Sequence, residues 1–393
     1  MNNRILIVLI LMSSMAAMSM DIFLPSLPTL KEAFQTEESV LQLSISLFMW
    51  AFALTQLMAG ILSDRYGRKP IFIIGCSLYI LASFGCALAA NFSQLLAFRF
   101  FQGFAVCVGP VTALSITRDL LPEKERAKAL SFIASAMALA PILAPLLGSF
   151  FETFFDWRAS FIFLAFFAAI LLLSLRQLPE TNLHQTAIHW KKMFGSYYRI
   201  ASNPIWQIYG SIAACSFCST FLWISASSIY LIDRLHFSQF QFALFFGVSA
   251  ASFMLSSFFN SILVSRLPIN TLIWIGSTST FLGGLLMFSF SWLELSVWRL
   301  WTPAILLSFG IGFILPNTNA AALTPFQKDA GKAAALTNFF RLSLAGGSVW
   351  LMSRFYDSHA RSLSLAIFIF GILQVSLSLL NSKRISRVSK MEC

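Results

Sequence analysis

The chain consists mostly of long apolar segments separated by short polar ones. The first covers residues 4–28, and eleven further segments of similar length follow within the 393 residues. A helix of about 20 apolar residues spans the hydrocarbon core of a bilayer. Because 58% of the residues are hydrophobic and only 11% are charged, the chain cannot cover a water-facing surface. We therefore predict an all-α polytopic membrane protein with twelve transmembrane helices.

The predicted spans form two groups of six, separated by a more polar segment. We predict an N-terminal six-helix bundle (1–178), a cytoplasmic linker (179–203), a C-terminal six-helix bundle (204–381) and a cytoplasmic tail (382–393). Arg65 follows the second span and Arg266 follows the eighth, at equivalent points of the two halves. Two related six-helix repeats are typical of transporters that work by rocking one bundle against the other.

The basic residues predict the orientation in the membrane. Most of the 27 Lys and Arg residues lie at alternate ends of the predicted spans. Cytoplasmic loops carry this excess, so both termini are expected in the cytoplasm. The first apolar segment is too long for a secretory signal and is interpreted as an uncleaved span. The net charge of +11 is explained by these loops, and we expect no nucleic-acid partner.

The cysteine and histidine residues form no metal-ligating pattern. Cys215 and Cys218 form a C-x-x-C inside a predicted span, where small apolar packing is the ordinary role of cysteine. The four histidines lie in connecting segments without a cluster. We expect no metal and no cofactor. A polytopic membrane enzyme would need a group of acidic, His or Cys residues near a membrane face, and the sequence shows none, so we do not expect an enzyme.

The segment after the second predicted span carries a family signature. Residues 60–70 read GILSDRYGRKP. They resemble the G-x-x-x-D-R-x-G-R-R/K signature of the major facilitator superfamily, at its usual position between spans two and three. The residues that match are Gly60, Asp64, Arg65, Gly67 and Arg68.

Three further segments resemble elements of proton-coupled members of that family. Span four contains an R-x-x-Q-G element, Arg99, Gln102 and Gly103. Span five contains the Gly/Pro element typical of antiporters, with Pro141, Pro145 and Gly148. Span one contains Asp21-Ile-Phe-Leu-Pro25, which is similar to the D-x-Y-L-P of Bcr/CflA-like multidrug:proton antiporters.

The resemblance implies the major facilitator fold and a mode of action. It implies proton-coupled export of small amphipathic compounds by alternating access, in a bacterial cytoplasmic (inner) membrane. The expected partners are a small-molecule substrate, protons and membrane lipid, and the expected state is a monomer. The alternative is a dedicated exporter of an endogenous metabolite, such as a carboxylate siderophore.

Two charged residues inside the spans are candidates for proton coupling. Asp21 lies roughly 25 Å along its helix from the cytoplasmic end, and Arg99 lies roughly 9 Å from the outer end of its span. The two could therefore meet, directly or through water. Burial disfavours a charged carboxylate and a nearby guanidinium favours it, so the pair could hold Asp21 where it exchanges a proton. The alternative is a permanently ionised Asp21–Arg99 brace.

The residues of the family signature are candidates for a cytoplasmic gate. Asp64 can face the N-terminus of span eleven, which starts near Ala333 and carries partial positive charge, with Arg118 as a second candidate partner. Gly60 would permit a close helix approach and Gly67 a tight turn. The alternative is a basic loop that only sets the topology. In span five, Pro141 and Pro145 predict a kink, with plain packing as the alternative.

The predicted substrate pocket combines residues from both halves. Buried charges in spans are costly and usually functional, which singles out Arg341 near the middle of span eleven. It could receive a carboxylate-bearing or polar substrate, or it could pair with Asn317, Asn319 or Asn338 instead. By resemblance to multidrug antiporters, adaptable methionines and flat apolar side chains complete the pocket. The predicted substrate-binding residues are Met20, Asp21, Met137, Phe221, Ile224 and Arg341.

Overall fold

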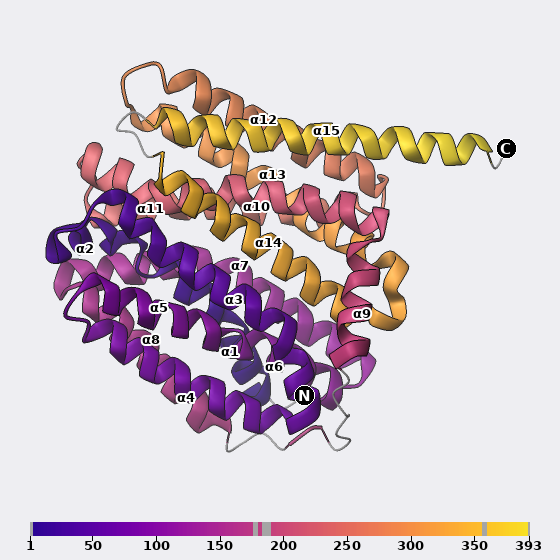
Figure 1. Ribbon diagram of the computed structural model, residues 1–393, viewed down its shortest axis with the longest axis horizontal. Coiled ribbons are helices and arrows are strands. Elements are labelled where there is room, and N and C mark those ends of the chain that lie inside the picture. The colour runs from indigo at the N-terminus through magenta and orange to yellow at the C-terminus, as the bar shows by residue number, and fades with distance from the viewer. Residues whose placement is uncertain (1–2, 176–179, 183–189, 356–359, 392–393) are drawn as a thin grey trace. The chain divides into compact units, whose positions relative to one another are not determined.

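The computed structural model describes residues 3–175, 180–182, 190–355 and 360–391, and its regular elements in these ranges are all helices (Figure 1). Within these ranges, eleven segments are long and apolar enough to cross a membrane. One of them, Val297–Ser353, contains two long helices, α13 and α14. Counting these two separately gives twelve spans, which confirms the predicted all-α polytopic architecture.

The chain divides into two compact units. Unit 1 comprises Met1–Trp190 and Ile232–Gly247, and unit 2 comprises Lys191–Leu231 and Val248–Cys393. The predicted linker, 179–203, lies partly outside the described residues, and its end forms helix α9, Trp190–Ala201. The predicted tail begins inside α15, which continues to Met391. The domain boundaries themselves remain predictions.

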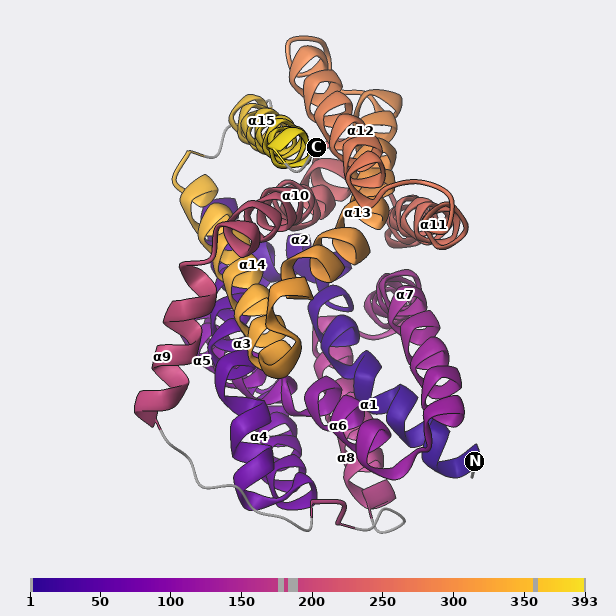
Figure 2. The same cartoon turned by 90° about the vertical axis from the view of Figure 1, so that its right-hand side faces the viewer.

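Unit 1 is a bundle whose helices pack side by side along most of their length. Helix α1 packs on α6 and α7, α3 packs on α5, and α4 packs on α5 and α8 (Figure 2). The elements are α1 Asn3–Asp21, η1 Leu24–Ser26, α2 Leu27–Phe34, α3 Glu38–Tyr66, α4 Arg68–Ala87, α5 Phe92–Val106, α6 Val108–Leu120, α7 Glu123–Phe154 and α8 Trp157–Ser174.

Unit 2 is also a helical bundle, and α10 packs on three of its other helices. Helix α10 packs on α13, α14 and α15, and α12 packs on α13 and α15. The elements are α10 Pro204–Ser228, η3 Ile229–Arg234, α11 Gln239–Leu263, α12 Ile269–Phe290, α13 Val297–Leu323, η4 Thr324–Asp329, α14 Ala330–Ser353 and α15 Arg361–Met391. The C-terminal half of η3, from Ile232, and the first part of α11, through Gly247, group with unit 1.

The first span is not one continuous helix, because α1 ends at Asp21. Pro25 explains this boundary. A proline has no N–H to donate to the carbonyl group four residues earlier, and its ring collides with that carbonyl, here the one of Asp21. A short turn therefore separates α1 from η1 and α2. The break places the only acidic residue of α1 at its last position.

Candidate functional site

Asp21 is a buried carboxylic acid without a polar partner. Its side chain is 6% exposed. Within the described part of the chain, no hydrogen bond or ion pair reaches its carboxylate. The position at the end of α1 also places the carboxylate beside the partial negative charge of the helix C-terminus, which disfavours a second negative charge. Both features favour the neutral form of this acid.

Arg99 lies in unit 1 as well, but the predicted direct contact with Asp21 is not among its bonds. Its guanidinium donates to the backbone carbonyl of Ser19 at 3.3 Å and to Oε1 of Gln102 at 2.6 Å. The rings of Phe23 and Phe48 lie on it, with centroids 4.1 and 4.2 Å from the guanidinium carbon. The side chain is therefore held by neutral groups: a carbonyl, an amide and two aromatic faces.

Gln102 was predicted with Arg99, but Ser19, Tyr79 and Ser83, which complete this arrangement, were not. Gln102 donates to the hydroxyl of Ser83 at 2.9 Å, and the hydroxyl of Ser19 contacts that of Tyr79. These residues connect α1, α4 and α5 around Arg99, and all are buried. The available signal was weak, because single Ser and Tyr residues are common in apolar spans. Only the contact between Arg99 and Gln102 could be expected from the sequence, because their i, i+3 spacing places them side by side on one helix.

Helix α7 approaches the break after α1 at one glycine. A Cβ on Gly148 would lie 1.8 Å from the carbonyl oxygen of Ile22, so only glycine fits at this crossing. Gly103 makes a similar approach, with its Cβ position 2.3 Å from the carbonyl oxygen of Phe48. Pro141 and Pro145 both lie inside the continuous helix α7. The small residue of the antiporter element thus contacts the backbone one residue after Asp21.

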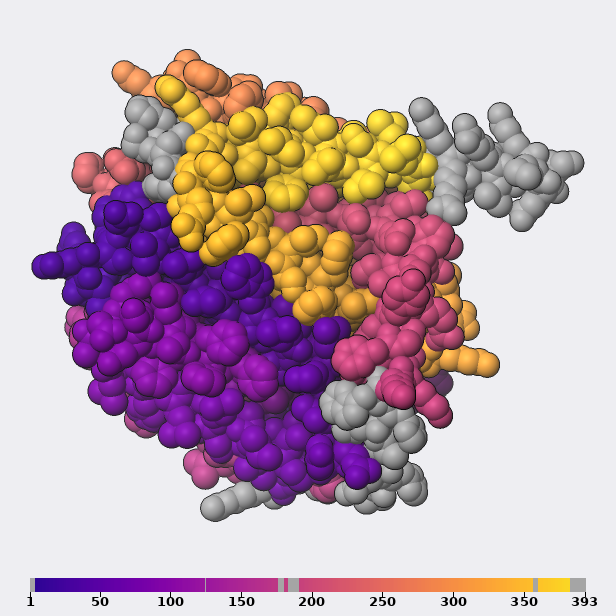
Figure 3. Space-filling model, in the orientation of Figure 1, coloured from indigo at the N-terminus to yellow at the C-terminus, as the bar shows by residue number. Residues whose placement is uncertain are grey.

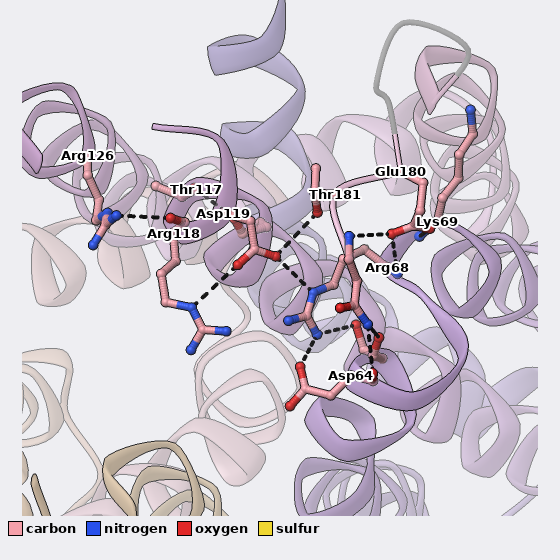
Figure 4. Close-up of polar contacts among 12 residues, drawn as sticks. Asp64, Arg68, Lys69, Thr117, Arg118, Asp119, Arg126, Glu180 and Thr181 are labelled. Atoms are coloured by element: carbon pink, nitrogen blue, oxygen red, sulfur yellow. Dashed lines mark hydrogen bonds and ion pairs between the residues drawn. The ribbon is translucent and has the colours of Figure 1, made fainter. Parts of the chain in front are cut away.

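The signature after α3 forms a network of paired charges (Figure 4). The network residues are Asp64, Arg68, Asp119 and Glu180, and we call them the turn network. Arg68 is 3% exposed, and its guanidinium lies between two carboxylates. It pairs with Asp64, donates from Nε to Asp119 at 3.2 Å and donates to the hydroxyl of Ser63 at 3.0 Å. The pairing joins the end of α3, the start of α4 and the end of α6.

Glu180 binds the N-terminus of α4. Its two carboxylate oxygens accept the backbone N–H groups of Arg68 and Lys69, each at 3.0 Å (Figure 4). Partial burial by itself raises the pKa of Glu180, but the backbone N–H groups of Asn182, Lys69 and Arg68 outweigh it and hold the pKa below its ordinary value. The next two residues continue the attachment, because Thr181 donates to Asp119 at 3.3 Å and Asn182 donates to the carbonyl of Asp64 at 2.7 Å.

Asp119 and Glu180 were also missed by the sequence analysis. Asp119 adjoins the predicted Arg118, and Glu180 is an acid at the start of a basic segment. Both signals concern charge, whereas the contacts depend on how α4, α6 and residues 180–182 meet. The spacing of these residues along the chain does not predict those contacts.

The other predicted gate residues have mixed outcomes. Gly67 forms the predicted tight turn, with a φ of +102° that favours glycine. The predicted close approach at Gly60 is wrong: a Cβ there would have no described atom within 4 Å. Arg118 lies 3.5 Å from Asp119 and has no bond to Asp64, because Arg68 occupies that carboxylate. Arg65 is exposed. A gating role for these residues remains a prediction.

The predicted pocket residues are divided between the two units. Met20 is half-buried, Met137 is 43% exposed, and both lie in unit 1 with Asp21. In unit 2, Phe221 is buried and Ile224 is half-buried. A pocket common to all of them remains a prediction.

Arg341 has the alternative partner considered for it, Asn338. Its guanidinium donates to Oδ1 of Asn338 at 2.9 Å and lies over the ring of Phe217, 4.5 Å from the centroid. Its Nε is buried with no hydrogen-bond acceptor among the described residues. Asn317 bonds to Asn260 instead. Arg341 is thus a cation within unit 2 whose donors are only partly used.

The sequence is similar to those of bacterial multidrug resistance proteins. Multidrug resistance protein D of Escherichia coli strain K12 is 26% identical over 376 residues, covering 95% of this chain and 94% of that protein. Multidrug resistance protein MdtL of Shewanella oneidensis is 27% identical over 363 residues, covering 91% of each.

The fold is similar to those of solved transporters. A crystal structure of a D-xylose–proton symporter superposes with a TM-score of 0.77 at 15% identity, covering 96% of each chain. A peptide transporter in complex with sulfate gives a TM-score of 0.78 at 12% identity, covering 98% of this chain and 95% of that one. Residues 9–350 match the family model described as Major Facilitator Superfamily. This chain therefore belongs to the Major Facilitator Superfamily, and it is a multi-pass membrane transporter rather than an enzyme.

Proposed function

We propose that this transporter exports small amphipathic compounds in exchange for protons, by alternating access. The names of its relatives support a multidrug-type substrate range. We propose further that it resides in a bacterial inner membrane with both termini in the cytoplasm, because the basic residues concentrate on that side of the predicted spans.

The buried and unpaired carboxyl of Asp21 is the observation that carries this proposal. An acid that lacks a cation partner and lies at a helix C-terminus is most stable when neutral. A cationic or polar substrate that arrives beside it stabilises the charged form, so binding releases the proton. Protonation from the opposite side then displaces the substrate. This competition for one carboxyl couples the two fluxes.

Arg99 has a supporting part in this proposal. It binds the carbonyl of Ser19, two residues before Asp21, and so fixes the end of α1. Its bonds to neutral groups leave a positive charge in unit 1 that no carboxylate of the described residues neutralises directly. We propose that Arg99 takes part in proton coupling through its bond to the end of α1. Gly148 holds the adjoining backbone at Ile22.

The turn network supports the proposed cytoplasmic gate. Arg68 and Glu180 bind the ends of α3, α4 and α6 into one assembly. A rigid end allows these helices to move together when the transporter changes state. We propose that Asp64, which is 46% exposed, remains able to exchange partners during that change.

Arg341 favours a second candidate function. Its buried guanidinium has a donor without an acceptor, and a carboxylate could satisfy it in a bidentate manner. This would fit an exporter of a carboxylate-bearing metabolite, such as a siderophore.

Proton flux into proteoliposomes tests the proposals together. The purified full chain is reconstituted with a pH gradient and challenged with tetraphenylphosphonium, a lipophilic cation, or with citrate, a carboxylate. We expect the cation to exchange for protons, Asp21→Asn to abolish the exchange, and Glu32→Gln, an exposed acid on α2, to leave it intact. Exchange of citrate alone, lost in Arg341→Gln, would favour the second candidate. Unchanged exchange in Asp21→Asn would reject the carboxyl switch.

A further inference from the structure

Helix α9 has one buried face. Met193, Tyr197 and Ile200 are buried, and their i, i+4, i+7 spacing places them on one side of the helix. Two polar contacts fix the helix to the start of α14. Lys332 donates to Ser196 at 3.2 Å, and Arg199 pairs with Asp329, which also binds Lys332.

The opposite face of α9 combines exposed aromatic rings with exposed cations. Phe194 is 63% exposed and Tyr198 is 77% exposed, and they are neighbours at i, i+4. Lys191 lies one turn before Phe194 on this face, and Lys192 is exposed on the other flank of the helix. Atoms of α9 form part of the surface seen in Figure 3. Two large exposed rings beside cations are costly in water and typical of a membrane interface.

The chain keeps helix α9 close to the bilayer. Helix α9 ends at Ala201, and the membrane span α10 begins at Pro204, capped by Asn203. So short a connection can extend only about 10 Å. Helix α9 runs across the direction of α10 rather than along it, as both views show (Figures 1 and 2). A helix that crosses the end of a span at this distance lies along the membrane surface.

We propose that α9 is an interfacial anchor that binds anionic phospholipids. Phe194 and Tyr198 insert their rings at the boundary between headgroups and acyl chains, while Lys191 and Lys192 bind the lipid phosphates. The charge of Arg199 is already matched by Asp329, so the two lysines supply most of the attraction. The positive face and the tether to a span favour a negatively charged membrane surface over a protein partner. This role does not depend on the transported substrate.

Nitroxide accessibility in proteoliposomes of phosphatidylcholine and phosphatidylglycerol tests where the face lies. The background carries Cys393→Ser, since the other five cysteines are buried. Labels are placed at Phe194→Cys and Tyr198→Cys, with exposed Lys128→Cys on α7 as the control position. We expect the two α9 labels to contact oxygen more than a water-soluble nickel chelate, and the control label to do the reverse. Labels at 194 and 198 that are as accessible to nickel as the control would overturn the proposal.

A lipid titration tests the charges separately. Phosphatidylglycerol binding to the detergent-solubilised full chain is followed by native mass spectrometry. We expect Lys191→Gln with Lys192→Gln to weaken the binding by about fivefold for each charge removed. The matched control, Lys128→Gln with Arg266→Gln, removes two exposed cations elsewhere and should bind as the unaltered chain does. Equal binding by the two double variants would show that α9 is not the site.

Discussion

Asp21 and Arg68 are both buried charged residues of unit 1, yet their surroundings differ. Arg68 is 3% exposed. Its guanidinium lies between two carboxylates, and its backbone N–H donates to a third. Asp21 is 6% exposed and has no polar partner among the described residues. Asp21 and Arg68 are thus buried to nearly the same extent, but in the ranges that the structure describes only Arg68 is paired with groups of opposite charge.

This difference separates a structural charge from an exchangeable one. A charge that is fully paired inside a protein cannot change state without leaving its partners uncompensated. A buried carboxyl without a partner can take up a proton without breaking an ion pair, and it releases the proton when a substrate compensates the charge. We infer that the turn network maintains geometry, whereas Asp21 performs the exchange.

Replacing Asp21 with Asn should have the largest effect on transport. The amide keeps the shape of the neutral acid and cannot release a proton, so we expect coupled export to fall to the level of empty liposomes. The thermal unfolding midpoint should stay within a few degrees of that of the unaltered chain, because no partner of Asp21 is lost. A large loss of stability would instead identify Asp21 as a structural brace.

Replacing Arg68 with Ala should have the opposite pattern. Asp64 and Asp119 would lose their shared cation, and we expect a loss of about 2–4 kcal/mol of unfolding free energy, moderated by the partial exposure of Asp64. Denaturation in a detergent series measures it. Arg65→Ala, at an exposed neighbour, is the control and should change stability by no more than about 0.5 kcal/mol. Equal effects of the two variants would contradict the buried pairing.

Two glycines, Gly148 and Gly60, test how tightly the backbone beside Asp21 and beside the turn network is packed. Gly148→Ala would force a Cβ into the carbonyl of Ile22 beside Asp21, at an expected cost of about 1–3 kcal/mol. Gly60→Ala places the same group in open space within a helix, and a gain of about 0.5–1 kcal/mol is expected. Unfolding measured on both variants checks the sign of each change. A destabilised Gly60→Ala would show that the predicted close approach exists after all.

Glu180→Gln should have the smallest effect and a defined pH dependence. Its carboxylate at the N-terminus of α4 contributes about 0.3–1 kcal/mol. Because the pKa of Glu180 is lowered in the folded chain, this contribution is present above the ordinary pKa and is lost as the pH falls through the lowered one. The two proteins should therefore differ at neutral pH and converge once the pH has fallen below the lowered pKa of Glu180. A difference that persists in acid would exclude the charge as its cause.

The sequence predicted the spans and the family well, because apolar length and a loop signature are local properties. It also placed Gly67 at a tight turn. It did not predict that α1 ends at Asp21, although Pro25 four residues later contains the reason. Hydropathy predicts the apolar segment as one span, because it depends on side-chain polarity and not on a missing backbone N–H.

The partners of the charged residues were largely beyond the sequence. Arg99 binds a backbone carbonyl and Gln102, and Arg68 binds Asp119, which lies on another helix. Such pairings depend on how helices far apart in the chain meet. Only contacts within one helical turn, such as that of Arg341 with Asn338, follow from spacing.

Infrared difference spectroscopy of the purified chain tests the central claim most directly. Tetraphenylphosphonium is added near neutral pH, and the C=O stretch of protonated carboxyl groups is followed. The account predicts that this band decreases when the cation binds, and that Asp21→Asn lacks the change while Glu32→Gln retains it. The same band loss in Asp21→Asn, or no loss in the unaltered chain despite bound cation, would contradict it.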